Sequence, residues 1–287
     1  MRGVTLKHYD DDAADESFAR RRDRRKPQGK RSVAALYRTD PAGNKSFNDP
    51  GLQALYERGY FSDILGELQS GKEANVYLAQ GPSGLLAAKV YRDLVVRSFR
   101  NDQVYREGRF IGDARIKKAV TQRTRAGLAA QQRLWVQTEY RQLWELHRAG
   151  IPAPEPMVGP GADDIAQAGR VVLMAFIGDE NGPAPRLSDL RLDGAAASDA
   201  FAQSLSILAR LLRLDKVHGD YSSYNLLWWQ GRVVVIDLPQ MVSVQENQQA
   251  QALLERDVRS LCLSFRKQGI TTEPAAVLAE VRRLAGH

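Results

Sequence analysis

Residues 218–225 read His-Gly-Asp-Tyr-Ser-Ser-Tyr-Asn, and Ile236 and Asp237 follow at the end of an apolar run. Asp220, Asn225 and Asp237 therefore occur in this order, five and then twelve positions apart. Phosphoryl transfer from ATP needs one carboxylate to orient the acceptor, and an amide oxygen and a second carboxylate to hold magnesium ions against the phosphates. The three residues supply these groups, so the stretch predicts a phosphoryl-transfer site.

The residues between Asn225 and Asp237 predict a β-hairpin. Residues 225–229 and 232–237 are short apolar runs typical of strands, and Gln230 and Gly231 lie between them. Glycine accepts a positive φ, which a tight hairpin turn requires. Such a hairpin brings Asn225 and Asp237 to one end. Each Asp alone is equally compatible with a capping or strand-end role, but the ordered set favours a metal site.

Composition limits the classes of protein that fit. The chain has 287 residues, of which 43% are hydrophobic, enough for the core of one two-lobed domain. It contains no apolar run of about 18 residues, so no membrane span or membrane partner is expected. Cys262 is the only cysteine, which rules out an internal disulfide and favours a cytoplasmic location. The four scattered histidines make a zinc site improbable.

The net charge of +7 is concentrated near the N-terminus. Residues 20–26 read Arg-Arg-Arg-Asp-Arg-Arg-Lys, and the first 50 residues are poor in apolar side chains. Such a segment buries too little surface to offset its ordering entropy, so residues 1–50 are predicted to form a flexible basic arm. The arm either contacts RNA or a ribosomal particle or is a solubilising tail, and the sequence leaves both open.

The folded part is predicted to begin near residue 51 with a strand, a small-residue loop and a returning strand. Residues 63–68 and 76–79 are the strands, and residues 69–75 form a loop whose backbone N–H groups could bind a triphosphate. A third strand, 85–91, carries Lys89 between apolar neighbours. The string Ala-Ala-Lys-Val around Lys89 resembles the Val-Ala-Ile-Lys strand of protein kinases, whose lysine reaches the phosphates of ATP.

A helix over 131–149 is predicted to provide the partner of Lys89. Its apolar residues recur at helical spacing along one face, and Glu139 lies beside that face. A partly buried carboxylate needs a partner, and Lys89 is the natural one. The alternative is a boundary glutamate whose stem covers apolar surface.

The C-terminal third is predicted to be short and helical. Residues 199–214 form one helix, and the tail from residue 245 forms one more, with Leu254, Val258, Leu261 and Phe265 on its buried face. Only 50 residues follow Asp237, and no Ala-Pro-Glu motif occurs among them. An activation segment and peptide-binding helical subdomains therefore do not fit.

Four strings carry a family resemblance. They are residues 70–77, Ser-Gly-Lys-Glu-Ala-Asn-Val-Tyr; residues 151–156, Ile-Pro-Ala-Pro-Glu-Pro; residues 174–178, Met-Ala-Phe-Ile-Gly; and residues 218–220, His-Gly-Asp. They are similar to the RIO family of atypical serine/threonine protein kinases, in particular to the subfamily without an N-terminal winged-helix domain. The resemblance runs from about residue 62 to residue 265.

The resemblance implies an α+β, bilobal protein-kinase-like fold over residues 51–287. The small antiparallel-sheet N-lobe would span about 51–174, and the reduced, mainly helical C-lobe about 178–287, without activation segment or peptide-binding subdomains. ATP and Mg²⁺, or Mn²⁺, would bind between the lobes.

By position, the resemblance also implies a role for each site residue. Asp220 would be the catalytic Asp, and Asn225 and Asp237 the metal ligands. The nucleotide would be bound by residues of four segments: Ser70 and Lys72 in the phosphate loop, Lys89 with Glu139 at the phosphates, Met174 behind the adenine, and Ala175 and Ile177 at its edge. In some relatives the residue at the position of Asp237 is itself phosphorylated, so an aspartyl-phosphate intermediate is a further expectation.

Three functions remain open at this stage. The first is a serine/threonine protein kinase that phosphorylates itself or a protein partner. The second is a small-molecule phosphotransferase of the aminoglycoside- or choline-kinase kind, which shares the His-Gly-Asp motif. The third is an ATPase that acts as a ribonucleoprotein assembly factor, and it would use the same active site as the first.

Overall fold

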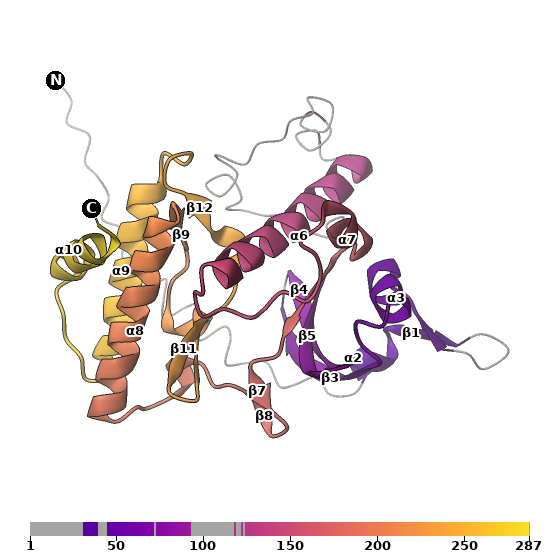
Figure 1. Cartoon of the computed structure of the whole chain (residues 1–287), viewed down its shortest axis with the longest axis horizontal. Coiled ribbons are helices and arrows are strands. Elements are labelled where there is room, and N and C mark those ends of the chain that lie inside the picture. Colours follow the sequence, from indigo (N-terminus) through magenta and orange to yellow (C-terminus); the bar gives the residue numbers. More distant parts are fainter. Residues whose placement is uncertain are drawn as a thin grey trace, which may run out of the picture.

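The structure, a computed structural model, describes residues 31–39, 45–71, 73–92, 118, 122 and 124–286 (Figure 1). A four-stranded antiparallel sheet forms the N-terminal part, in the order β3-β4-β5-β6. Its strands are β3 (Asp63–Ser70), β4 (Ala74–Gly81), β5 (Gly84–Tyr91) and β6 (Val171–Ala175). The three strands predicted before residue 92 are therefore present, and β6 closes the sheet against the strand that carries Lys89.

Helix α6 (Arg125–Arg148) runs between the sheet and the C-terminal helices (Figure 1). Its predicted apolar face is buried, with Val136, Tyr140 and Leu143 almost inaccessible to solvent. The Tyr140 hydroxyl donates to the Val171 carbonyl and accepts from the Leu173 N–H, which fastens the helix to β6. The position of α6 over the sheet is therefore fixed by hydrogen bonds as well as by apolar packing.

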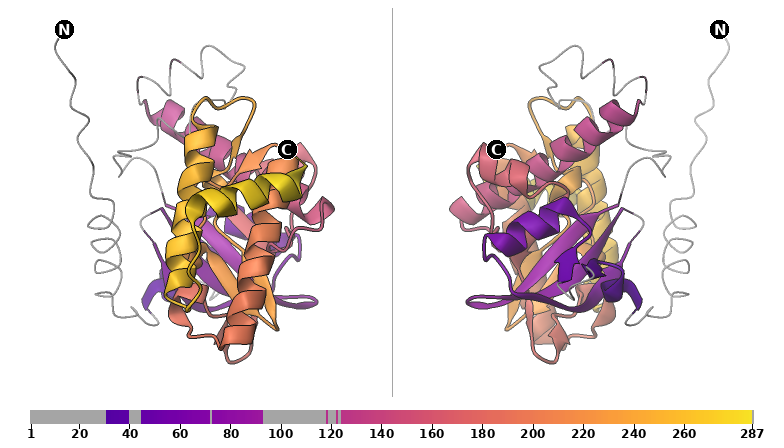
Figure 2. Two further views of the ribbon diagram at one scale, coloured as in Figure 1. Left: turned by 90° about the vertical axis from the view of Figure 1, so that its left-hand side faces the viewer. Right: turned by 90° about the vertical axis from the view of Figure 1, so that its right-hand side faces the viewer.

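The C-terminal part is mainly helical. Figure 2 shows α8, α9 and α10 on one side of the molecule and the elements of the N-terminal part on the other. These helices are α8 (Gly194–Arg213), α9 (Ala250–Arg266) and α10 (Pro274–Ala285). The shorter elements between β6 and α10 are β7 (Gly178–Asp179), β8 (Gly182–Pro183), η2 (Leu187–Asp189), β9 (Lys216–Val217), η3 (Ser223–Asn225), β10 (Leu226–Trp229), β11 (Arg232–Val235), η4 (Leu238–Gln240) and β12 (Val242–Ser243). No described helix is long and apolar enough to cross a membrane.

The tail from residue 245 is not one helix, as predicted, but two. Helix α9 ends at Arg266, and Gly269 follows with φ 85°, a left-handed conformation that glycine adopts without strain. Pro274 then occupies the first turn of α10, where its missing N–H costs nothing. The two breakers explain the division, and the apolar face predicted on residues 254–265 lies entirely on α9.

The N-terminal segment also differs from the prediction of an arm over residues 1–50. Residues 31–49 contain described elements, and Phe47 is buried against Tyr37 and Phe61, with ring centroids 4.6 and 5.5 Å away. These elements are α2 (Arg31–Ala34), β1 (Tyr37–Thr39) and β2 (Lys45–Phe47), followed by α3 (Pro50–Glu57); α7 (Ala162–Gln167) lies beside α3. The low average apolar content of residues 1–50 did not reveal that two aromatic side chains, Tyr37 and Phe47, pack together there. Residues 1–30 lie outside the described part.

Asp49 joins this segment to the sheet. Its side chain caps α3 by accepting the Leu52 N–H and forms an ion pair with Arg170, and it is only 4% exposed. We expect Asp49→Ala to lower the free energy of unfolding by about 2–3 kcal/mol, because it removes a cap and leaves Arg170 unpaired. Urea denaturation measures this loss.

The matched control is Asp193→Ala, which removes the exposed cap of α8 and one hydrogen bond, to the Ala196 N–H. It should cost about 1 kcal/mol. If the two variants lose the same stability, the Asp49 ion pair does not tie the N-terminal segment to the sheet.

Candidate active site

The hairpin of β10 and β11 brings Asn225 and Asp237 to one end, as the sequence predicts. The strands pair antiparallel, and the Ile236 N–H donates to the Asn225 carbonyl at 2.9 Å, just beyond the ladder. Asp237 therefore follows directly after the residue that faces Asn225. The turn has φ 50° at Gln230 and φ 73° at Gly231, the two positive values of a type I′ turn.

The side chain of Asn225 is oriented by Asp220. Its Nδ2 atom donates to the Asp220 carbonyl at 2.8 Å and to Asp220 Oδ2 at 2.9 Å. These bonds use both amide protons, so Oδ1 is the atom that remains as an acceptor. Asn225 is buried, whereas Asp220 is exposed. The buried amide thus holds an accessible carboxylate in one orientation.

Lys89 connects two carboxylates from different elements. Its Nζ atom lies 2.7 Å from Glu139 Oε1 on α6 and 3.3 Å from Asp237 Oδ1. The side chains of Lys89 and Glu139 are only 13% and 4% exposed, so the predicted pair is present and largely buried. Burial lowers the pKa of Lys89, but the negative charge of Glu139, with a contribution from Asp237, raises it well above its ordinary value. The lysine is therefore charged.

Tyr91 is a part of this cluster that the sequence analysis missed. Its hydroxyl donates to Glu139 Oε2, and Lys89 Nζ lies 5.2 Å from its ring centroid. Burial and the charge of Glu139 raise the pKa of Tyr91 well above its ordinary value, so the hydroxyl remains a donor. Both oxygens of Glu139 therefore have a partner on β5. Because residues two apart in a strand share a face, the spacing of Lys89 and Tyr91 was the available signal.

Asp237 has a backbone conformation unusual for a residue other than glycine. Its φ of 65° and ψ of 62° lie in the left-handed region, which Asp tolerates better than most residues. Its side chain is 44% exposed, while the next residue, Leu238, is buried. This bend turns the carboxylate out of the apolar run that precedes it and towards Lys89.

Two buried polar side chains, those of His218 and Asp257, form hydrogen bonds with the backbone of the 218–225 loop. Burial lowers the pKa of His218 to about 4, so its ring is neutral. Its Nδ1 atom accepts the Asp220 N–H at 3.3 Å, and Nε2 lies 3.2 Å from the Ile236 carbonyl, to which the neutral ring donates. On the other side, Asp257 of α9 accepts the N–H groups of Gly219 and Tyr221 at 2.8 and 2.9 Å.

Asp257 was not predicted as a site residue, although its place on the buried helix face can be read from the sequence. Asp257 directly precedes Val258 on the predicted buried face, where an unpaired carboxylate would be costly. It is 1% exposed, and burial raises its pKa to about 7 despite its two hydrogen bonds from backbone N–H groups. A carboxylate on the apolar face of a helix signals a specific partner elsewhere in the chain.

The remaining predicted residues lie around the same sheet. Ser70 is the last residue of β3, Met174 and Ala175 end β6, and Ile177 follows them. Ala175 N–H donates to the Glu155 carbonyl, and the Ile177 carbonyl accepts from the Ala184 N–H. Lys72 lies outside the described residues. The structure thus places Ser70 on β3 and Met174 and Ala175 on β6, the strands at the two edges of the sheet, and Ile177 just after β6.

The residues at the end of the hairpin fit a hard divalent cation. Asp237 offers an exposed carboxylate and Asn225 an amide oxygen, the ligand types that Mg²⁺ takes together with water and phosphate oxygens. Within the described residues no group of three or more His, Cys, Asp or Glu side chains could hold a metal by itself. The site therefore suits a cation that shares its coordination with a ligand.

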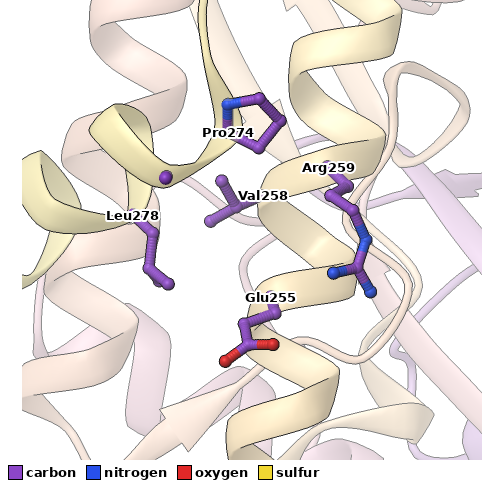
Figure 3. A pocket seen from close by; sticks show the side chains of 6 residues that line it. Glu255, Val258, Arg259, Pro274 and Leu278 are labelled. Atoms are coloured by element: carbon purple, nitrogen blue, oxygen red, sulfur yellow. The ribbon is translucent and has the colours of Figure 1, made fainter.

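Two cavities lie in the C-terminal part. One, of about 190 Å³, lies between α9 and α10 and contains no predicted site residue (Figure 3). It is lined by Glu255, Val258, Arg259, Pro274, Ala275 and Leu278. The other, of about 80 Å³, adjoins η3 through Ser223 and Tyr224. Neither contains Lys89 or Asp237, so the functional assignment depends on the side-chain cluster and not on these cavities.

Comparisons with known proteins identify the family to which this chain is similar. The model of the RIO domain family matches residues 75–277. The serine/threonine-protein kinase RIO1 of Chaetomium thermophilum is 33% identical over 76% of this chain and 42% of that protein. The RIO-type serine/threonine-protein kinase Rio1 of Haloferax volcanii is 34% identical over 78% of this chain and 71% of that protein. This chain thus covers less than half of the Chaetomium protein.

A solved structure shows the fold. The Rio2 kinase of Chaetomium thermophilum, solved as an ADP/Mg²⁺-phosphoaspartate complex, aligns with a TM-score of 0.58 at 16% identity. The alignment covers 96% of this chain and 78% of that one. The predicted α+β, protein-kinase-like fold is therefore confirmed.

We expect Asp257→Asn to destabilise the protein by about 1–3 kcal/mol, because the amide NH₂ would face one of the two N–H groups that Asp257 now accepts. The effect should depend on pH. Burial raises the pKa of Asp257 from 3.8 to about 7 in the folded state, so the folded protein binds the proton more tightly than the unfolded chain. The resulting stability is present at low pH and is lost as pH rises through 7.

Urea denaturation of both proteins at pH 5 and pH 8 measures the difference. The substitution should cost more at pH 5, and Asp193→Asn on the exposed cap of α8 controls for the lost charge. An equal cost at both values would contradict the raised pKa of Asp257.

Proposed function

Because the chain belongs to the RIO domain family, we propose that it is a serine/threonine protein kinase that uses MgATP. The acceptor would be a serine hydroxyl on the protein itself or on a protein partner. The observation that carries the proposal is the convergence of Lys89, Glu139 and Asp237 from β5, α6 and the end of the hairpin. Asn225, which binds Asp220, lies at the same end of the hairpin. This set of charges fits a triphosphate and its cation.

In this proposal, Lys89 binds the α- and β-phosphates, and Glu139 with Tyr91 holds it in place. A lysine alone would lose rotamer freedom when it binds phosphate, whereas here its position is fixed beforehand. Ser70, the last residue of β3, begins the phosphate loop, and we assign Lys72 to this loop as well. The loop is tight at Gly71, where a Cβ atom would approach the Ala74 carbonyl to 2.7 Å.

The adenine would meet the end of β6. Met174 lies behind the ring, and the backbone of Ala175 and Ile177 faces its edge. Ala175 N–H and the Ile177 carbonyl are already engaged within the protein. The Ala175 carbonyl and the Ile177 N–H are therefore the groups we assign to adenine, one as an acceptor and the other as a donor.

Asn225 and Asp237 would hold Mg²⁺, with Mn²⁺ as an alternative. The cation, when bound, neutralises charge on the phosphates. The similar Rio2 kinase supports this choice, since its structure is a complex with ADP and Mg²⁺. Asp237 in turn keeps its carboxylate accessible through the left-handed bend.

Asp220 would orient the acceptor hydroxyl and receive its proton. It is exposed; Asn225 orients its side chain, and the neutral His218 accepts its backbone N–H. The Rio2 complex also contains a phosphoaspartate, so Asp237 itself is a second acceptor that we propose to test. Water attack on such an acyl phosphate would give net ATP hydrolysis, the activity of the assembly-factor alternative.

The comparisons support the alternative functions and the predicted partners to different degrees. The small-molecule phosphotransferase is not favoured, because the similar proteins are named protein kinases. Contact with RNA or a ribosomal particle through the basic arm stays a proposal, as does a cytoplasmic location. Much of the arm lies outside the described residues.

Incubation of the full chain with ATP labelled at the γ-phosphate, with Mg²⁺ and with or without a generic protein acceptor, tests the proposal. We expect the label on serine or on Asp237. Hydroxylamine distinguishes the two, because it leaves phosphoserine intact and removes the phosphate of an aspartyl phosphate. Asp220→Ala should slow transfer about 10²–10⁴-fold, because a positioned base is lost, while MgATP affinity is kept.

The matched control is Asp189→Ala on η2, an exposed Asp in the same part of the chain. It should transfer phosphate like the unchanged protein. Wild-type turnover by Asp220→Ala would overturn the assignment, and release of free phosphate alone would favour the ATPase.

A further inference from the structure

Arg92, the residue after β5, reaches back to the loop between β3 and β4. Its Nη2 atom donates to Ser70 Oγ at 3.0 Å and to Asn75 Oδ1 at 2.7 Å, and its Nε atom lies 3.2 Å from the same Asn75 oxygen. Ser70 and Asn75 face each other in the register of the two strands. One guanidinium therefore binds both sides of the hairpin where the phosphate loop begins and ends.

The backbone of Arg92 strengthens this connection. Its N–H donates to the Glu73 carbonyl at 2.8 Å, inside the loop. Its carbonyl accepts from Gln132 Nε2 of α6 at 2.9 Å. Arg92 thus joins the phosphate loop, the end of the Lys89 strand and the helix that carries Glu139.

The chemistry of these contacts requires arginine. A planar guanidinium can donate along several fixed directions at once, whereas a lysine ammonium is a compact point charge on a flexible stem. All side-chain partners of Arg92 are neutral, and no carboxylate of a described residue lies within ion-pair distance of it. Arg92 therefore acts on Ser70 and Asn75 through the directions of its hydrogen bonds.

We infer that Arg92 is a positioning residue for the phosphate loop, and the inference rests on the proposed function. By holding Ser70 and Asn75, it keeps the loop in the shape that receives the β- and γ-phosphates. It acts through these residues and is not assigned a bond to the nucleotide. It should therefore matter for ligands with phosphates and not for adenosine.

The test is calorimetric titration of the full chain, with Mg²⁺, by ATP, ADP and adenosine. Arg92→Met should weaken ATP and ADP binding about tenfold, since the hydrogen bonds of one charged group are lost, and should leave adenosine affinity unchanged. Arg92→Lys should weaken ATP and ADP binding as much as Arg92→Met, because lysine keeps the positive charge but cannot donate hydrogen bonds in the fixed directions of a guanidinium. An equal loss for adenosine, or wild-type ATP binding by Arg92→Lys, would overturn the positioning role.

Two further variants separate this inference from the proposed function. Arg58→Met is the matched control, since Arg58 is also an N-lobe arginine that binds two oxygens, on Asp164 and Gln167, and should leave ATP affinity unchanged. Lys89→Met should weaken ATP binding whether or not Arg92 acts as inferred. If Lys89→Met binds ATP normally, the proposed nucleotide site itself is wrong. If Lys89→Met weakens ATP binding but Arg92→Met binds ATP normally, only the inference about Arg92 fails.

Discussion

The ion pair between Lys89 and Glu139 is the interaction on which the position of α6 against the sheet depends. Removing two charges from water is costly, and the pair is tolerable only if its remaining hydrogen-bonding groups are satisfied. Tyr91 binds the second Glu139 oxygen, and Asp237 lies near the ammonium. Displacement of α6 from β5 would leave a buried carboxylate without partners. The helix is therefore held close to the sheet before any ligand binds.

A second set of buried polar groups shapes the loop that carries Asp220. His218 and Asp257 bind successive backbone N–H groups of this loop, from the hairpin side and from α9. The backbone cannot relax without leaving one of these groups unsatisfied in the interior. The C-terminal helices thus contribute to the site through side chains of α9: Asp257 accepts two N–H groups of the loop, Ser264 accepts the Ser223 N–H, and Arg256 donates to the Gly219 carbonyl.

The sequence predicts the parts of the site that depend on local pattern. Asn225 and Asp237 were identifiable because a two-residue turn determines the pairing of their strands, and Glu139 because it lies beside an apolar helix face. Asp257, Tyr91 and Arg92 were missed because their partners lie 17 or more positions away in sequence, and the face on which a residue lies does not identify a distant partner. The aromatic anchors in residues 31–49 were missed because average composition conceals two rings that pack together.

Exposure divides the cluster into two classes of residue. Asp220 and Asp237 are open to solvent, while Glu139, Asn225, His218 and Asp257 are buried. The exposed carboxylates remain accessible to a cation or a hydroxyl, and the buried groups cannot change partners without large cost. A nucleotide entering from the open side would therefore meet charges whose orientation is already fixed. Such preorganisation would lower the reorganisation that the proposed phosphoryl transfer requires, and it follows largely from burial of the supporting groups.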